Sequence, residues 1–223
     1  MLNMTQDIKI ITLPLPLHMG QVNSYLLQNS AGYFLIDTGG SNARRELLRE
    51  VESIGCMPNS LKLVILTHGD FDHIGNAAYF RSVFGAEIAM HADDSGMAER
   101  GDMFVNRKKP NIIIRSLIPV FMGLGTSERF TPDVLLTDGY DLSQHGLEAK
   151  VISLPGHSKG SVGILTTNGD LFCGDLFENT KGPALNSLID DSAAANASVA
   201  ILKGLNIETV YPGHGQPFAM NLL

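Results

Sequence analysis

Residues 67–76 read Thr-His-Gly-Asp-Phe-Asp-His-Ile-Gly-Asn. The six consecutive positions 68–73 include four side chains that commonly bind metal ions: His68, Asp70, Asp72 and His73. An apolar run at residues 61–66 precedes them and is typical of a strand, and apolar residues at helical spacing follow at 74–84. In an extended turn, residues 68, 70 and 72 point to one side, because side chains alternate with a period of two. Carboxylates and imidazoles crowded in this way predict a bound cation.

A simpler explanation is that these residues form an acidic cap of the helix that begins after residue 73. A capping side chain accounts for one aspartate at most, because it satisfies only the free amides of a single helix start. It also leaves both histidines without a role. The metal site is therefore the stronger interpretation.

The composition of the 223-residue chain narrows its class. Hydrophobic residues make up 44% of the chain, enough for a full core, and the net charge of −7 makes contact with nucleic-acid phosphates unfavourable. No apolar run approaches the roughly 18 residues of a membrane span, and Pro14 and Pro16 interrupt the apolar N-terminal segment, which argues against a signal peptide. We therefore expect a cytoplasmic protein that acts on a small molecule, without nucleic-acid or membrane partners, and with Cys56 and Cys173 reduced.

The chain is predicted to form a single domain over residues 1–223. Strands are expected at residues 8–13, 22–28, 33–36, 61–66, 147–154, 162–167, 170–173 and 207–211. Helices are expected at residues 42–54, 74–84 and 192–205. Residues 91–146, with scattered glycine and proline, are interpreted as an insertion that contains short helices.

Two features of this insertion leave alternatives open. Its apolar segment at 110–125 is interpreted as core, as a lid over the site or as a homodimer contact. Its basic run Arg-Lys-Lys at 107–109 is interpreted as a solvated face rather than an anion-binding site.

Asn168-Gly169 is a strong signal for a tight hairpin between the strands at 162–167 and 170–173. Antiparallel pairing brings the end of the second strand back beside the start of the first, which follows Pro155-Gly156-His157-Ser158. We therefore predict that His157 and Asp175 lie close in space. The last strand leads into a third turn, Pro212-Gly213-His214-Gly215.

Three glycine-containing turns beside strand ends thus present histidine or aspartate side chains. The candidate metal ligands are His68, Asp70, Asp72, His73, His157, Asp175 and His214. This set suits two adjacent divalent ions that share a carboxylate, because a single ion would leave too many of these groups without a partner.

The order of these motifs resembles the metallo-β-lactamase superfamily. The series His-x-Asp-x-Asp-His, Pro-Gly-His-Ser, Gly-Asp and Pro-Gly-His-Gly, together with Ile-Asp-Thr-Gly at 36–39, follows the order of that family from Val22 to His214. The resemblance implies an α+β fold, an αββα sandwich of two mixed β-sheets flanked by helices. It also implies a metal site at one edge of the sandwich.

The resemblance further implies the ligands of each ion. One ion would be held by His68, Asp70 and His157, and the second by Asp72, His73 and His214. Asp175 would bridge both ions. Asp37 would lie close to the metal-binding turns and orient ligand imidazoles.

Asp70 departs from the family pattern, because most members have a histidine at this place. With Asp70, three carboxylates and a bridging hydroxide neutralise two divalent ions, whereas a histidine leaves one positive charge. A less positive centre makes its bound water less acidic, and oxygen ligands favour harder ions. Zinc stays the leading expectation for the metal, and iron and manganese become stronger candidates. As an alternative, Asp70 does not coordinate the first ion and lies just outside its ligands.

The expected reaction is hydrolysis of a small ester, thioester or lactone-like substrate by a metal-bridging hydroxide. Asp72 is a candidate catalytic residue, because a carboxylate beside this water can also move a proton. β-Lactam cleavage is not expected with Asp70 in place of histidine. Glyoxalase II activity is not expected either, because only nine residues follow His214. The alternative is an iron-dependent oxygenase or sulfur-oxidising enzyme on the same fold, and a non-catalytic metal-binding protein ranks last.

Overall fold

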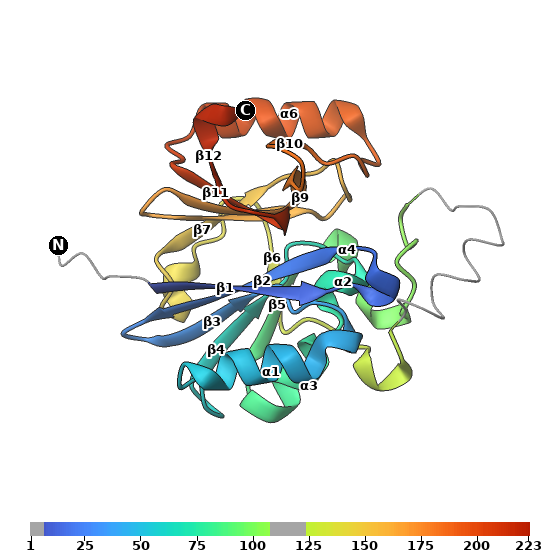
Figure 1. Ribbon diagram of the computed structural model, residues 1–223, viewed down its shortest axis with the longest axis vertical. Coiled ribbons are helices and arrows are strands. Elements are labelled where there is room, and N and C mark those ends of the chain that lie inside the picture. The colour runs from blue at the N-terminus through green and yellow to red at the C-terminus, as the bar shows by residue number, and fades with distance from the viewer. Residues whose placement is uncertain (1–6, 108–123) are drawn as a thin grey trace.

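Two six-stranded β-sheets packed face to face form the centre of the molecule, and helices cover both outer faces (Figure 1). The structure, a computed structural model, describes residues 7–107 and 124–223. Most of the apolar segment at 110–125 falls outside these residues, so its assignment to core, lid or homodimer contact stays a prediction. No helix in the described part of the chain is long and apolar enough to cross a membrane.

The first sheet has the order β1-β2-β3-β4-β5-β6. Its strands are β1 (Asp7–Pro14), β2 (Gln21–Asn29), β3 (Gly32–Ile36), β4 (Leu61–Ile65), β5 (Glu87–His91) and β6 (Val134–Leu136). The first three strands form an antiparallel meander, and β3 to β6 run parallel. This meander and β4 match the strands expected from the sequence.

The strands β5 and β6 are missing from the sequence prediction. In β5 the three central residues, 88–90, are all buried, because this parallel strand is covered on both faces. Its sequence therefore lacks the alternation of apolar and polar residues that marks a half-buried strand. The strand β6 has only three residues and lies within 91–146. Part of the stretch interpreted as an insertion therefore belongs to the first sheet.

The second sheet has the order β12-β11-β9-β8-β7, with β10 paired to β9. Its strands are β7 (Ala149–Ser153), β8 (Val162–Thr166), β9 (Asp170–Asn179), β10 (Ala184–Leu185), β11 (Thr209–Gly215) and β12 (Phe218–Ala219). The predicted hairpin joins β8 and β9, which pair antiparallel, and Gly169 in its turn has φ +86°. The strand β9 is longer than expected and carries Asp175 within it.

The helices form the outer layers. The α-helices are α1 (Arg44–Ser53), α2 (Phe71–Ile74), α3 (Ala77–Phe84), α4 (Ala92–Arg100) and α6 (Ser192–Lys203). Short 3-10 helices lie at Pro16–His18, Ser41–Ala43, Thr126–Glu128, Leu142–His145 and Met220–Leu222. Helices α1 and α3 cover the first sheet and α6 covers the second, which gives the expected αββα sandwich (Figure 1).

The helix expected at 74–84 begins only at residue 77, as α3, and a separate four-residue helix, α2, precedes it. The backbone of Gly75 passes so close to the turn at 39–41 that a Cβ at this position would lie 2.5 Å from the amide nitrogen of Ser41. The side chain of Asn76 donates to the carbonyl oxygens of Thr38 and Gly40, at 2.8 and 2.9 Å. These contacts fix the α2 turn against the 37–41 loop.

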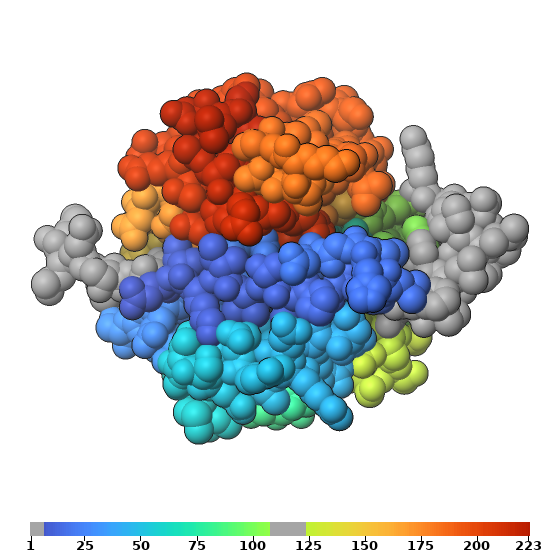
Figure 2. Space-filling model, viewed as in Figure 1, coloured from blue at the N-terminus to red at the C-terminus, as the bar shows by residue number. Residues whose placement is uncertain are grey.

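Three apolar layers hold the sandwich together, one between the two sheets and one beneath each helical layer. In Figure 2 the blue N-terminal strands abut the red C-terminal segment, in agreement with the packing of β2 against β11. The chain segments that follow β4 and β7, the middle of β9 and the end of β11 meet at one edge of this sandwich. The candidate ligands lie there.

Candidate metal centre

Four histidines at this edge share one orientation: each holds its Nδ1 against a protein oxygen and turns its Nε2 inward. The Nδ1 contacts are His68 with Thr67 Oγ1 at 3.0 Å, His73 with Asp37 Oδ2 at 2.8 Å, His157 with the Leu188 carbonyl at 2.6 Å, and His214 with the Gln21 carbonyl at 2.7 Å. For His73, His157 and His214 the partner is a carbonyl or carboxylate oxygen, which can only accept, so Nδ1 carries the proton. The neutral ring then has its lone pair on Nε2, as a metal ligand requires.

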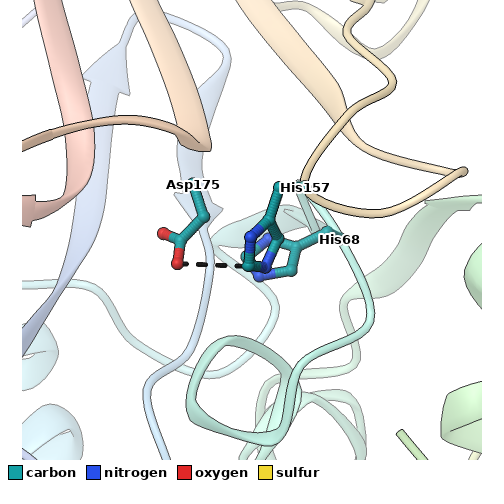
Figure 3. A group of neighbouring side chains, drawn as sticks. All are labelled: His68, His157 and Asp175. Atoms are coloured by element: carbon teal, nitrogen blue, oxygen red, sulfur yellow. Dashed lines mark ion pairs between the residues drawn. The ribbon is translucent and has the colours of Figure 1, made fainter. Parts of the chain in front are cut away.

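The inward atoms form two groups. The first group, His68, His157 and Asp175, is drawn in Figure 3, and its ligand atoms lie within 4.8 Å of one another. The second group, Asp72, His73 and His214, meets the same limit. The helix α2 supplies two of its members, and β11 supplies the third.

Asp175 lies between the two groups. Its Oδ1 is 3.4 Å from His73 Nε2, and its Oδ2 is 3.3 Å from His214 Nε2. The same Oδ2 lies 4.0 Å from His157 Nε2, as the Asn168-Gly169 hairpin predicts. One carboxylate therefore faces imidazoles of both groups.

Three of the inward atoms have no hydrogen-bond partner among the described residues: His68 Nε2, His73 Nε2 and Asp175 Oδ1. All three are buried, and leaving a buried polar atom without a partner costs about 1–3 kcal/mol. Divalent ions at the two groups would satisfy each of these atoms. The residues present therefore fit two metal ions.

Asp37 connects both groups to the fold. Its Oδ2 accepts from His73 Nδ1 and from Thr67 Oγ1, at 2.8 and 2.7 Å, and its Oδ1 accepts from the Thr67 amide at 2.8 Å. Because the Thr67 hydroxyl donates to Asp37, it is left to accept from His68 Nδ1. Asp37 thereby orients His73 directly and His68 through Thr67.

The turn around His214 is tied to β2. The Tyr25 hydroxyl donates to the Pro212 carbonyl at 2.5 Å, and Asn23 Nδ2 donates to the Gly215 carbonyl at 2.7 Å. Both donors are buried. The two sheets are therefore joined by hydrogen bonds beside the second group.

Asp70 stands beside the first group without belonging to it. Its Oδ2 is 3.0 Å from His157 Nε2 and 3.7 Å from His68 Nε2, and its Oδ1 forms an ion pair with Arg107. Burial favours the neutral acid, but the hydrogen bond with His157 and the charges of His68 and Arg107 outweigh it. They hold the pKa of Asp70 well below its usual range.

The expectation of a solvated basic face at 107–109 is wrong for Arg107, and residues 108 and 109 lie outside the described residues. Its side chain is 8% exposed, and its Nε donates to Asp190 Oδ2 at 2.5 Å. Its Nη2 donates to the His157 carbonyl at 2.7 Å. A single arginine in a loop carries no periodic signal, and its partners lie far away in the sequence, so the pattern could not reveal this role.

Asp94, in the first turn of α4, is a second residue that the sequence gives no reason to select. It is fully buried, and its Oδ2 accepts from the Gly69 amide at 3.0 Å and from Ser158 Oγ at 2.6 Å. Its Oδ1 accepts from the Gly160 amide at 2.9 Å. This carboxylate ties together the two turns that carry His68 and His157.

The ionisable groups of the centre strongly perturb one another. Burial opposes charge on His214, but the Asp175 and Asp72 carboxylates outweigh it and raise the pKa of His214 to about 9. At His73 the carboxylates of Asp175, Asp37 and Asp72 outweigh burial and raise its pKa well above the usual value. Burial acts the other way on Asp72 and raises its pKa. Protons and metal ions therefore compete for the same Nε2 atoms.

A cavity of about 410 Å³ opens onto both groups. Its apolar lining consists of Leu15, Met19, Met103 and Leu188, and its acidic lining includes Asp70, Asp72, Asp175 and Glu178. A small molecule in this cavity would reach Asp72, His157 and His214.

Comparisons with known proteins agree with this geometry. The profile of the metallo-beta-lactamase superfamily matches residues 19–214. The hydroxyacylglutathione hydrolase GloC of Haemophilus influenzae is 31% identical over 151 residues, which are 66% of this chain and 63% of that protein. Metallo-beta-lactamase domain-containing protein 1 of Xenopus laevis is 30% identical over 190 residues, 82% of this chain and 66% of that protein. The chain thus spans slightly less than two thirds of these relatives.

Solved structures share the fold. The protein ST1585 from Sulfolobus tokodaii aligns with a TM-score of 0.75 at 20% identity, over 98% of this chain and 83% of that chain. TTHA1623, solved in a di-iron-bound form, aligns with a TM-score of 0.69 at 28% identity, over 94% and 95% of the two chains. With its αββα sandwich and its converging histidines and aspartates, the chain belongs to the metallo-β-lactamase superfamily.

Proposed function

We propose that this chain is a dinuclear metal-dependent hydrolase of a small ester, thioester or lactone-like substrate. The observation that carries the proposal is the convergence of four Nε2 atoms around Asp175, with three buried atoms of the centre unpaired among the described residues. A structural role for these side chains would leave those atoms unsatisfied. A pair of divalent ions would use them all.

The chain's own residues would divide the work of binding two ions. The first group would hold one ion, with Asp70 Oδ2 near enough to join it, and the second group would hold the other. Asp175 faces both groups and would bridge them. Two such ions would supply an acidified water and polarise the oxygen of the bond to be cleaved.

Asp72 is the candidate for moving a proton. It lines the cavity, its Oδ2 lies 3.6 Å from His214 Nε2, and burial raises its pKa. A carboxylate whose pKa is raised toward the working pH accepts and returns a proton more readily than an exposed aspartate. Asp72 would take a proton from the attacking water and pass it to the leaving group.

The cavity supports an uncharged, partly apolar substrate. Leu15, Met19, Met103 and Leu188 offer an apolar surface for an acyl or ring portion, and Glu178 at the same cavity disfavours an anion there. The net charge of −7 likewise favours a small molecule over nucleic acid. The similarity to GloC supports thioesters in the substrate class, and it weakens the argument from chain length against glyoxalase II chemistry.

Metal identity separates the leading proposal from its rival. The di-iron form of TTHA1623 supports iron beside zinc and manganese. Iron at this centre would also permit the oxygenase or sulfur-oxidising alternative. Glutamate and aspartate oxygens around the site favour harder ions than thiolates do.

The test is elemental analysis of the chain purified without added metal, together with assays on carboxylic ester, thioester, lactone and phosphodiester substrates. We expect hydrolysis that chelation abolishes and that Zn²⁺, Mn²⁺ or Fe²⁺ restores. His214→Gln should reduce turnover by about a hundredfold or more, since metal polarisation contributes several kcal/mol to the rate.

His145→Gln is the matched control, because His145 contacts Tyr140 and Glu87 rather than the centre. It should leave turnover unchanged. Stoichiometric iron with oxygen consumption and no hydrolysis would support the rival. Full turnover in His214→Gln, or in the chelated protein, would overturn the proposal.

A further inference from the structure

Arg107 places a permanent positive charge at the first ligand group. Its guanidinium is almost enclosed, with Asp70, Asp190 and the His157 carbonyl around it. An arginine cannot lose its proton under ordinary conditions. The positive charge is therefore present whether or not a metal ion is bound.

The guanidinium uses atoms that a metal ion at the first group would also need. Its Nη2 lies 3.3 Å from His157 Nε2. This is the ring nitrogen that stays available to a metal ion, because His157 Nδ1 contacts the Leu188 carbonyl. Its Nη1 pairs with Asp70, whose other oxygen is 3.0 Å from the same Nε2. A metal ion needs the lone pair of this Nε2 and the space beside it, so it cannot bind there while the guanidinium keeps this contact.

Charge repulsion acts in the same direction as this competition. Two cations a few ångströms apart repel strongly where solvent is excluded, and the buried surroundings of Asp70 and His157 limit screening by salt. The guanidinium has another partner in Asp190, a carboxylate outside both groups. Release of His157 therefore need not leave Arg107 unpaired.

The second group has no such cation. Within the described residues, Asp72 forms ion pairs with the imidazoles of His73 and His214, and no lysine or arginine pairs with this group. The two metal positions therefore differ in a way that their ligand types alone do not reveal.

We propose that Arg107 is an internal competitor for the first metal position: its guanidinium and a metal ion contend for His157 and Asp70, which makes this position weaker than the second. The inference rests on the metal centre of the proposed function and adds to it a residue that sets the order of metal loading. Under limiting metal, the second position fills first, and the first fills when the guanidinium withdraws from His157 toward Asp190.

The test is calorimetric titration of the metal-free full chain with Zn²⁺ alone, without substrate. The wild-type chain should show a tighter and a weaker site. In Arg107→Gln the weaker site should gain at least about tenfold in affinity, because a nearby positive charge is removed, while the tighter site changes by less than about twofold.

Two variants control for charge and for folding. Lys159→Gln removes a positive charge from an exposed side chain that pairs with Asp93, and it should leave both affinities unchanged. Arg107→Lys keeps the charge and should bind like the wild type, which also guards against a folding defect specific to glutamine.

The outcomes separate the two proposals. A weaker or unchanged first site in Arg107→Gln would overturn the competition and make Arg107 a support for Asp70. An equal gain in Arg107→Lys would also overturn it. If neither wild type nor Arg107→Gln bound any Zn²⁺, the proposed metal centre itself would fail, whereas two bound ions with no effect of Arg107 would spare that centre.

Discussion

The two ligand groups differ in what surrounds them more than in what they contain. Each combines histidine with aspartate within the same distance limit, and Asp175, a member of the first group, also faces the imidazoles of the second. The second group is held by Asp37 and by the main chain of β2, and its charged neighbours are its own imidazoles and carboxylates. In the first group, Arg107 contacts His157, and Asp94 binds the main chain of the turn that carries His68.

Two sites with similar ligands can therefore bind metal ions with unequal affinity. Outer contacts orient imidazoles and set the local charge, so they tune affinity without touching the ion. Both groups offer a cation a buried Nε2 atom without a partner among the described residues, His68 in the first and His73 in the second, but the first already has the guanidinium of Arg107 beside it.

The largest effect is expected from Asp175→Asn, which alters the carboxylate shared by both groups. The amide keeps the shape but removes the negative charge that offsets two ions, so metal binding at both positions should weaken and turnover should fall by about a hundredfold or more. Metal titration and steady-state kinetics measure this. Asp170→Asn on the same strand is the control, and near-normal binding at either position in Asp175→Asn would refute the bridging role.

Asp37→Asn and Thr67→Val test which residues orient the ligand histidines of each group. Losing contacts that orient ligands typically costs 10–100-fold in metal affinity. Asp37→Asn should weaken both positions, because Asp37 contacts His73 and reaches His68 through Thr67. Thr67→Val should weaken the first position alone.

Zn²⁺ titration of the two single variants and the double variant measures these affinities. In the double variant, the loss at the first position should be close to that of Asp37→Asn alone, because both changes break the same path to His68. Equal losses at both positions in Thr67→Val would show that Thr67 does not act through His68.

Asp94→Asn tests the support behind the first group. An amide cannot accept all three hydrogen bonds that the two carboxylate oxygens accept from Gly69, Ser158 and Gly160. A buried group left unsatisfied costs roughly 1–3 kcal/mol in the free energy of unfolding. Denaturant unfolding of the metal-free chain measures this loss.

Asp93→Asn is the matched control, because Asp93 lies next in the chain and pairs with the exposed Lys159. Its free energy of unfolding should change by less than about 0.5 kcal/mol. If both variants lose the same amount, the buried carboxylate is not what ties the two turns together.

The smallest effect concerns the pH dependence of the metal-free chain. The pKa of His214 is about 9 in the folded chain, against an ordinary value near 6.5, because Asp175 and Asp72 outweigh burial. Its contribution to stability is therefore complete below about pH 6.5 and is lost as the pH rises through 9, by roughly 1–3 kcal/mol.

Thermal unfolding between pH 6 and 9.5 follows this loss. The metal-loaded chain should show a flatter profile, because ions replace the proton on Nε2. In the first group burial lowers the pKa of His68, whereas Asp70 outweighs burial at His157 and raises its pKa, so His157 adds a smaller loss of the same sign. An equally steep profile in metal-free His214→Gln would contradict this assignment.

Sequence patterns predicted the parts of the molecule that depend on neighbouring residues. The stretch 67–76 contains four candidate metal ligands within ten positions. The Asn168-Gly169 turn was enough to predict that His157 lies near Asp175, and His157 Nε2 is 4.0 Å from Asp175 Oδ2. The meander and the longer helices follow from periodicity. The αββα arrangement followed from the family resemblance rather than from periodicity.

The remaining features depend on contacts between distant residues. A buried parallel strand such as β5 has no alternation, and β6 is too short to show a pattern. Arg107 pairs with Asp190, which is 83 residues away in the sequence, and with Asp70, which is 37 residues away. Asp94 meets Ser158 across 64. Such pairs become visible only when the two sheets pack and bring these loops to one edge.

We expect this edge of the sandwich to hold two metal ions per chain. Native mass spectrometry of the wild-type chain after Zn²⁺ addition and removal of excess metal counts them directly. We expect species with one and then two bound ions as Zn²⁺ increases, and no bound ion after chelation. A chain that remains free of metal at every Zn²⁺ concentration, or that never takes up a second ion, would contradict the account.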